Sequence, residues 1–307
     1  MNNRIGALVV TYNRIECLKK VLQCYSESDV KPDYVMVLDN ASRKDTYDFL
    51  EEWKNIKECF NKIVIHVKEN QGSSKGFSIA LNEYLKYPVD WIFLADDDAY
   101  PTKETIGSFL EYIKSNKCDD VAAICAKVLN HKCIDVSHRR RTIKRGVMIK
   151  SIPVSLKEYD LPFFELDEFS YVGTGINVNA INKCGVTKDD LYIFYDDTEH
   201  SLRLRQYGKI LCVPSIVIIH DKNPKKSNID FQTYYYIRNR GWLIDHYFGR
   251  IYRNFYILNI YLRNICFISA KIKNYSAKEK KLYKDALFDL KHGKLGINEL
   301  YLPGWER

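Results

Sequence analysis

The first 126 residues alternate short apolar runs with segments in which apolar residues recur every three or four positions. Short apolar runs are typical of buried strands, and the longer periodic segments are typical of helices packed on a sheet. The predicted strands cover residues 5–10, 34–38, 63–67, 91–95 and 121–126. The predicted helices follow Asn13, which can cap the first of them, and then cover about residues 45–58, 74–85 and 103–115.

This alternation predicts an α/β fold with a mostly parallel sheet and helices on both of its faces. In such sheets, ligands bind outside the carboxyl ends of the strands. Polar residues stand at that end of the predicted strands, namely Thr11, Asp39, Asn70 and Asp96. The pattern therefore predicts a polar site along one edge of the sheet.

The rest of the chain is less regular, and its pattern indicates where the domains begin and end. Residues 127–168 predict an excursion or small hairpin, and two short helices and the strand-like runs 210–213 and 216–219 follow. A polar, proline-containing linker at 222–228 precedes a region with a helical pattern to about residue 290. We therefore expect one domain at 1–221, with halves at 1–126 and 127–221, and a C-terminal helical region at 222–307.

Composition narrows the class of protein. Apolar residues make up 46% of the 307 residues, which excludes wholesale disorder. The nine cysteines form no C-x-x-C pair, so we expect free, mostly buried thiols. The start of the chain leaves no room for a signal peptide, and no apolar stretch is long enough for a transmembrane helix. These features predict a cytoplasmic protein.

Charge is distributed unevenly. Residues 1–221 hold 30 basic and 32 acidic side chains, whereas residues 222–307 hold 17 and 7. The C-terminal region is also rich in tyrosine, tryptophan and arginine. Helices packed on the first domain are the simplest interpretation, an anionic membrane surface is the second, and a single-stranded nucleic acid is the third. We expect no nucleic acid, because the first 221 residues are near neutral.

Asp96, Asp97 and Asp98 directly follow the apolar strand 91–95. Adjacent carboxylates repel one another, and at least one becomes neutral unless a cation shares the site. Magnesium and manganese bind carboxylates together with substrate phosphates. A solvated turn is the alternative. The position of the triplet at the sheet edge favours a metal site that binds a nucleotide diphosphate.

A second acidic cluster comprises Asp196, Asp197 and Glu199, behind an aromatic run at 192–195. Acidic residues in a first helical turn are a structural alternative for Glu199. A carboxylate beside apolar rings has a raised proton affinity, which suits a general base. His220 ends the run 216–219 and is either structural or a further metal ligand, if its strand joins the same sheet.

Two glycine-containing segments lack known phosphate-binding signatures. The segment from Gly72 to Gly76, which contains Lys75, does not match a P-loop. The segment Gly173-Thr174-Gly175 lacks the third glycine of a dinucleotide fingerprint. Both segments still let a ligand approach the backbone closely.

Taken together and in order, these motifs resemble glycosyltransferase family 2, which consists of inverting enzymes with a GT-A nucleotide-sugar fold. The resemblance covers about residues 5–221, and its later part is similar to the galactofuranosyltransferase and rhamnosyltransferase branch. Its first part rests on residues 9–14, 38–42, 70–72 and 96–98. Its later part rests on residues 173–175, 195–203 and 220. Ser73 and Ser74 stand where the family usually has a Gly-Gly pair.

The resemblance implies roles for individual residues. Asp197 matches the catalytic base. The acceptor side would comprise Asp196, Glu199, Gly173, Thr174 and Gly175. The nucleotide-sugar site would comprise Thr11, Asn13, Arg14, Asp39, Asn40, Asn70, Gly72, Lys75, Asp96 and Asp97. The Mn²⁺ or Mg²⁺ ligands would be Asp98, His220 and Asp96, with Asp97 and Asp98 able to exchange roles.

The implied activity is metal-dependent transfer of a sugar to a hydroxyl of a glycan or lipid-linked glycan, in surface polysaccharide biosynthesis. We expect UDP-galactofuranose as donor, with dTDP-rhamnose or a UDP-hexopyranose as alternatives. The basic C-terminal region suggests a peripheral position at the inner face of the cell membrane. A nucleotidyltransferase, which would release pyrophosphate, and a nucleic-acid-binding module are the alternatives outside this class. The sequence does not indicate an oligomeric state.

Overall fold

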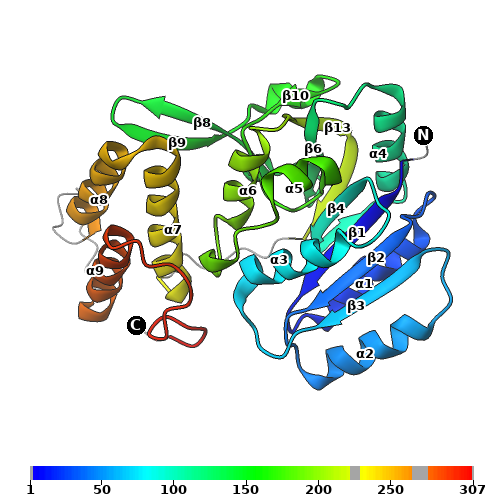
Figure 1. Ribbon diagram of the computed structural model, residues 1–307, viewed down its shortest axis with the longest axis horizontal. Coiled ribbons are helices and arrows are strands. Elements are labelled where there is room, and N and C mark those ends of the chain that lie inside the picture. The colour runs from blue at the N-terminus through cyan, green and yellow to red at the C-terminus, as the bar shows by residue number, and fades with distance from the viewer. Residues whose placement is uncertain (1–2, 222–228, 265–275, 306–307) are drawn as a thin grey trace.

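The computed structural model describes residues 3–221, 229–264 and 276–305, so the linker predicted at 222–228 lies outside the described residues. Its main sheet has the strand order β10-β13-β6-β12-β4-β1-β2-β3 (Figure 1). The strands are β1 (Ile5–Thr11), β2 (Tyr34–Asp39), β3 (Asn61–His66), β4 (Trp91–Asp96), β6 (Val121–Asn130), β10 (Phe164–Glu165), β12 (Thr174–Asn177) and β13 (Lys209–His220). Two short strands, β5 (Ala99–Pro101) and β7 (Cys133–Ile134), pair with β13 and β6.

The sheet is mostly parallel, as predicted. Strands β3, β2, β1, β4, β6 and β13 run in one direction, and β12 lies antiparallel between β4 and β6. The chain enters β12 through Gly173, whose φ is +65° and whose N–H donates to Leu94 O. A Cβ at Gly173 would lie 2.6 Å from the Ile218 side chain, so the turn requires glycine.

Apolar side chains fill both faces of the sheet, because buried parallel strands have apolar residues on either side. One face packs against α1 (Ile15–Glu27), α2 (Lys44–Asn55) and α4 (Thr105–Ser115). The other packs against α3 (Gly72–Tyr84), α5 (Val178–Cys184) and α6 (Asp196–Leu204). The α/β fold with helices on both faces is therefore confirmed.

The excursion after β6 contains a hairpin, as expected. Strands β8 (Arg139–Arg145), β9 (Met148–Pro153) and β11 (Glu168–Phe169) form a separate three-stranded sheet. The 3-10 helices η1 (Val136–His138) and η2 (Leu156–Asp160) flank this hairpin, and η3 (Asp189–Leu191) precedes α6. Figure 1 shows the hairpin extending from the sheet toward the C-terminal helices, and β9 contacts α8.

The C-terminal region is helical where it is described, with α7 (Phe231–Phe248), α8 (Arg250–Asn264) and α9 (Ala277–Lys291). These helices share an apolar cluster of their own, which also takes in Tyr192 from the segment before α6. Figure 1 shows them as a bundle to one side of the sheet. None of the helices in the described ranges is long and apolar enough to cross a membrane.

Three local expectations need correction. The runs predicted as two strands form the single strand β13, with an irregularity between Val213 and Val217. Asn13 does not cap α1; its side-chain oxygen instead accepts from Arg43 N and joins two loops at the sheet edge. The eight cysteines of the described residues are free, but only Cys125 and Cys212 are buried.

Candidate active site

A cavity of about 380 Å³ lies at the carboxyl edge of β1, β2 and β4. Seven of the residues predicted for the nucleotide-sugar site line it: Thr11, Arg14, Asn40, Asn70, Gly72, Asp96 and Asp97. Gly72 has a φ of +85°, and its carbonyl accepts from Asn40 Nδ2 while its N–H donates to Asn70 Oδ1. Parallel strands end at one edge, which explains why four separate loops meet here.

Arg14 supplies a cation to the aspartate triplet. Its Nη1 lies 2.8 Å from Asp97 Oδ1, and its Nη2 lies 2.5 Å from Asp98 Oδ2. Thr11 Oγ1 donates to the other oxygen of Asp97 at 2.8 Å. The triplet is therefore not a solvated turn, because its second carboxylate is buried and bonded on both oxygens.

His220 approaches the triplet from β13, with its Nε2 3.3 Å from Asp98 Oδ1. It reaches this place because β13 runs parallel to β6 and pairs at its end with β5, which directly follows the triplet. One ligand atom from each of Asp96, Asp98 and His220 lies within 4.8 Å of the others. Two carboxylates and an imidazole at this separation fit a divalent cation such as Mn²⁺.

The carboxylates of the triplet differ in proton affinity. Burial raises the pKa of Asp96 to about 6, and the charge of Asp98 adds to this effect. Burial likewise raises the pKa of Asp97 to about 7, although Arg14 opposes it. Burial also acts on Asp98, but hydrogen bonds from His220 and Arg14 outweigh it and lower its pKa to about 2. Asp98 is thus the most strongly anionic of the three.

His138 supports His220 and was missed in the sequence. Its Nε2 lies 3.2 Å from His220 Nδ1, and its Nδ1 lies 2.6 Å from Ser170 Oγ. Asp135 Oδ2 lies 3.4 Å from the same Nε2 of His138. Such contacts to the second ring nitrogen orient a metal-binding histidine. They leave Nε2 of His220 facing Asp98.

The second acidic cluster lies in the first turn of α6. Burial, together with the charge of Asp197, raises the pKa of Asp196 well above its usual range. Burial raises the pKa of Asp197 to about 6, and Asp96 is close enough to add to the shift. Asp197 also accepts a hydrogen bond from Thr198 N at 2.6 Å. A half-buried carboxylate with this proton affinity beside the triplet can serve as a general base.

The loop at residues 192–195, which directly precedes this cluster, has a strained backbone. Tyr192, Phe194 and Tyr195 all have φ values between 66° and 68°, a region that bulky residues rarely adopt. Asn239 of α7 holds the loop, because its Nδ2 lies 2.9 to 3.0 Å from the carbonyls of Leu191, Ile193 and Phe194. The C-terminal bundle therefore positions the segment that leads into Asp197.

We expect Asn239→Leu, which keeps the volume but removes the donor, to lower the free energy of unfolding. A buried carbonyl left without its partner costs about 1–3 kcal/mol. Chemical denaturation measures the loss. Asn254→Leu on exposed α8 is the matched control and should change stability far less. Equal stabilities for the two variants would contradict the role given to Asn239.

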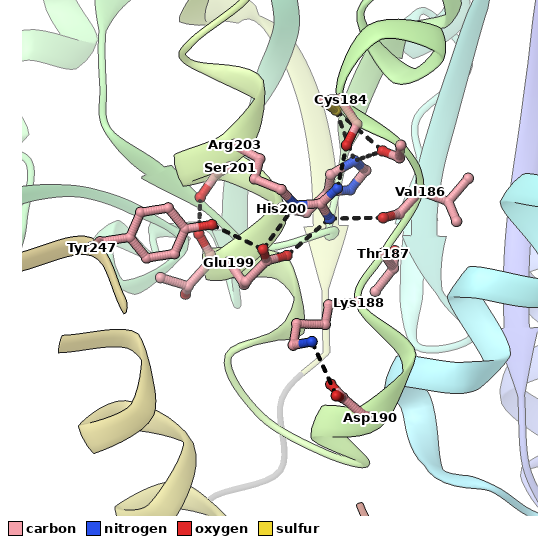
Figure 2. A network of polar contacts seen from close by, with 12 residues as sticks. Cys184, Val186, Thr187, Lys188, Asp190, Glu199, His200, Ser201, Arg203 and Tyr247 are labelled. Carbon is pink, nitrogen blue, oxygen red and sulfur yellow. Dashed lines mark hydrogen bonds and ion pairs between the residues drawn. The ribbon is translucent and has the colours of Figure 1, made fainter. Parts of the chain in front are cut away.

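Glu199 lies in a buried network rather than in the cavity (Figure 2). Its carboxylate pairs with Arg203 at 2.8 Å and accepts from Tyr247 Oη at 2.9 Å. Arg203 in turn donates to the carbonyls of Cys184 and Val186. The structure thus gives Glu199 a part in joining α6, α5 and α7, which favours the structural alternative over acceptor binding.

The glycine segment before β12 also serves packing. Thr174 is fully buried, and its hydroxyl donates to Ser170 O. Gly175 faces the Phe109 ring so closely that a Cβ would overlap it. Of the predicted acceptor-side residues, these two therefore lie inside the sheet, and Gly173 forms its turn.

Three residues predicted for the nucleotide site do not line the cavity, and their polar groups bond to other protein groups. Asp39 accepts from Ser42 N and lies 2.8 Å from His66 Nδ1. The Asn13 side chain bonds Arg43 N. Lys75 Nζ lies 3.4 Å from Asp189 Oδ2 of η3. Their predicted contacts with a nucleotide stay predictions.

Several cavity residues were missed in the sequence. Tyr192 and Ile193 come from the strained loop, and Phe231, Gln232 and Pro303 come from the C-terminal region. The aromatic run at 192–195 was the only available signal, because no local pattern indicates that α7 and the C-terminal segment fold back onto the sheet edge.

Comparisons with known proteins agree with this geometry. The model of the family described as Glycosyl transferase family 2 matches residues 7–178. The dTDP-rhamnosyl transferase RfbF of Shigella flexneri is 27% identical over 256 residues, covering 80% of this chain and 81% of the relative. The galactofuranosyltransferase GlfT1 of Mycolicibacterium smegmatis is 31% identical over 263 residues. This match covers 78% of this chain and 83% of the relative.

A solved structure shows the same fold. GalNAc-T7, crystallised with UDP, GalNAc and Mn²⁺, superposes with a TM-score of 0.66 at 14% identity. The match covers 94% of this chain and 56% of that protein. Because the family model matches more than half of the chain, including most of the residues that line the cavity, family membership is shown. The chain belongs to glycosyltransferase family 2 and is a nucleotide-sugar glycosyltransferase with the GT-A fold.

Proposed function

We propose that this chain transfers a sugar, with inversion and with a divalent metal, from a nucleotide-sugar to a hydroxyl of a glycan or lipid-linked glycan. The observation that supports this most is the juxtaposition of two acidic clusters. One, with His220, lines and borders the cavity at the sheet edge, and the other places Asp197 near Asp96. The first suits a diphosphate, and the second suits proton transfer.

The residues divide the reaction between them. Asn40, Asn70 and the backbone near Gly72 offer donors and acceptors for a nucleoside in the cavity. Arg14 presents its guanidinium to the diphosphate side. Asp197 removes the proton from the acceptor hydroxyl as that oxygen forms its bond to the anomeric carbon. The bond from the anomeric carbon to the nucleoside diphosphate breaks on the opposite face.

Asp98, His220 and Asp96 would hold the metal, and Mn²⁺ or Mg²⁺ fits this donor set. When bound, such an ion neutralises the charge that develops on the leaving diphosphate. Arg14 shares Asp98 with that site, so its guanidinium must adjust as the diphosphate enters.

UDP-galactofuranose is our first choice of donor, and dTDP-rhamnose or a UDP-hexopyranose is the alternative. The similarity to RfbF and GlfT1 supports the first two, because their names specify a dTDP-rhamnosyl and a galactofuranosyl transfer. We place the reaction in surface polysaccharide assembly, at the inner face of the membrane. The excess of basic residues in 222–307 supports that location.

A panel of nucleotide-sugars with Mn²⁺ tests the proposal. The donor should raise the unfolding temperature and release nucleoside diphosphate, with UDP-galactofuranose and dTDP-rhamnose as the decisive members. EDTA should remove both effects. Release of pyrophosphate instead, or no stabilisation by any donor, would contradict the proposal.

We expect turnover to depend on pH through Asp197. The base must be ionised, and burial raises the pKa of Asp197 to about 6 from its ordinary value near 3.8. Protonation therefore occurs already as pH falls through about 6, and kcat should decrease there in proportion to the ionised fraction. Stopped assays between pH 5 and 8, with circular dichroism as a folding control, measure this. A kcat that is constant over that range would contradict it.

A further inference from the structure

Arg240 is a half-buried guanidinium without a carboxylate partner among the described residues. Among the described residues, its hydrogen bonds are long, at 3.4 Å to Tyr195 Oη and 3.5 Å to Ile149 O. A cation removed from water is unfavourable unless an anion or several good acceptors compensate it. The protein therefore leaves this guanidinium only weakly compensated.

Two other buried arginines show how the chain satisfies such a group when its role is structural. Arg139 is fully buried and donates to the carbonyls of Ala126, Val172 and Gly173 at 2.8 to 3.1 Å. Arg238 donates to Gly296 O at 2.7 Å and to Asn239 Oδ1 at 3.0 Å. Arg240 differs from both, which points to a ligand rather than to a structural role.

Arg240 stands between two adjoining cavities, which share Ile149, Arg240 and Ile244 in their walls. The smaller cavity, of about 40 Å³, reaches Thr198, the residue after the proposed base. The larger, of about 350 Å³, runs between β9 and α8. Arg240 therefore lies where the smaller cavity, which reaches the first turn of α6, meets the larger cavity beside α8.

The larger cavity combines apolar walls with positive charge. Its lining includes Met148, Phe255 and Ile260, and its three charged residues are Lys150, Arg240 and Arg263, all basic. Helix α8 has no buried residue, and Ile251, Phe255 and Leu258 are exposed along it. An amphiphile with a long apolar chain and an anionic head complements these features.

We propose that this groove, formed by β9, α7 and α8 around Arg240, binds the phosphate-bearing lipid end of a lipid-linked acceptor. The hydrocarbon chain lies along β9 and α8, the phosphate meets Arg240, and the glycan extends past Thr198 toward Asp197. This assignment rests on the proposed function and specifies the substrate class of the same site.

The test uses farnesyl diphosphate as probe, on the full chain in EDTA, so that the diphosphate cannot bind through a metal. Inorganic diphosphate and farnesol are the charge-only and chain-only comparisons. Calorimetry should show that farnesyl diphosphate binds more tightly than either. Arg240→Gln should weaken its binding about 10- to 100-fold, the usual effect of losing a charged hydrogen bond. Arg250→Gln, on the exposed start of α8, is the matched control and should bind like the unaltered protein.

Phe255→Ser provides a second variant, because Phe255 is exposed and its loss does not threaten folding. It should weaken the binding of farnesyl diphosphate. Equal affinity of the unaltered protein, Arg240→Gln and Phe255→Ser would overturn the assignment. So would binding only to phosphatidylglycerol vesicles, which would indicate a bilayer surface. Because this assay needs no sugar transfer, failure of the groove and failure of the proposed function are distinguishable.

Discussion

Asp197→Asn is expected to lower kcat by about 10² to 10⁴, the usual effect of removing a general base. The amide has nearly the shape of the carboxylate and can still accept from Thr198 N, which lies 2.6 Å from Asp197 Oδ1. It cannot take the proton of the acceptor hydroxyl. Affinity for the nucleoside diphosphate with Mn²⁺ should stay within about twofold, because Asp197 does not line the donor cavity.

The control for this variant is Asp189→Asn, which removes a carboxylate from the preceding η3 segment. Asp189 is half exposed and does not line the donor cavity, so its loss should leave kcat nearly unchanged. Single-turnover assays separate the chemical step from product release. An Asp197→Asn variant with the kcat of the unaltered protein would remove Asp197 as the base.

Asp98→Ala is expected to abolish the metal-dependent part of donor binding. Asp98 is the most acidic carboxylate of the triplet and faces Nε2 of His220, so we expect it to be the strongest anionic ligand for a metal at this site. With Mn²⁺, the affinity for the nucleoside diphosphate should fall at least about tenfold. In EDTA the affinity should not fall, because the substitution also frees Arg14 Nη2 from its ion pair.

Asp221→Ala is the matched control, since Asp221 lies at the same edge but pairs with Lys20. It should retain the dependence on Mn²⁺. Titration calorimetry with and without the metal measures both variants. Unchanged affinity of Asp98→Ala with Mn²⁺ would exclude Asp98 as a ligand.

The residues at the sheet edge were predictable from the sequence because each one lies at or just beyond the end of its own strand. Each apolar run ends at a polar residue, and parallel strands bring those ends together. Thr11, Asn70 and Asp96 meet around one cavity for this reason. His220 followed the same rule once β13 joined the sheet in parallel with β6.

The rest of the site depends on contacts between distant segments. Nothing near Asn239 in the sequence indicates that it bonds three carbonyls more than forty residues earlier. The positive φ values of Tyr192, Phe194 and Tyr195 contradict local preference, and the contacts from α7 hold this loop in place. The partner of the triplet was also hidden: Arg14 was expected at the diphosphate, and the structure pairs it with Asp97 and Asp98.

Glu199 shows that a motif does not fix the role of each of its side chains. Its place beside Asp196 and Asp197 suggested acceptor binding. Arg203 lies one helical turn later, however, and forms an ion pair with its carboxylate. Tyr247 of α7 completes the contact. The position of Glu199 in a first helical turn had already offered a structural interpretation, and the fold revealed its partners Arg203 and Tyr247.

The central claim is that two acidic clusters have separate tasks, the triplet holding the leaving diphosphate and its metal, and Asp197 moving the proton. The most direct test measures kcat and the Mn²⁺-dependent affinity for the nucleoside diphosphate in Asp98→Ala and Asp197→Asn side by side. We predict that Asp197→Asn loses turnover and keeps affinity, whereas Asp98→Ala loses the metal-dependent affinity. If both variants lost the same property to the same extent, the division of tasks would be contradicted.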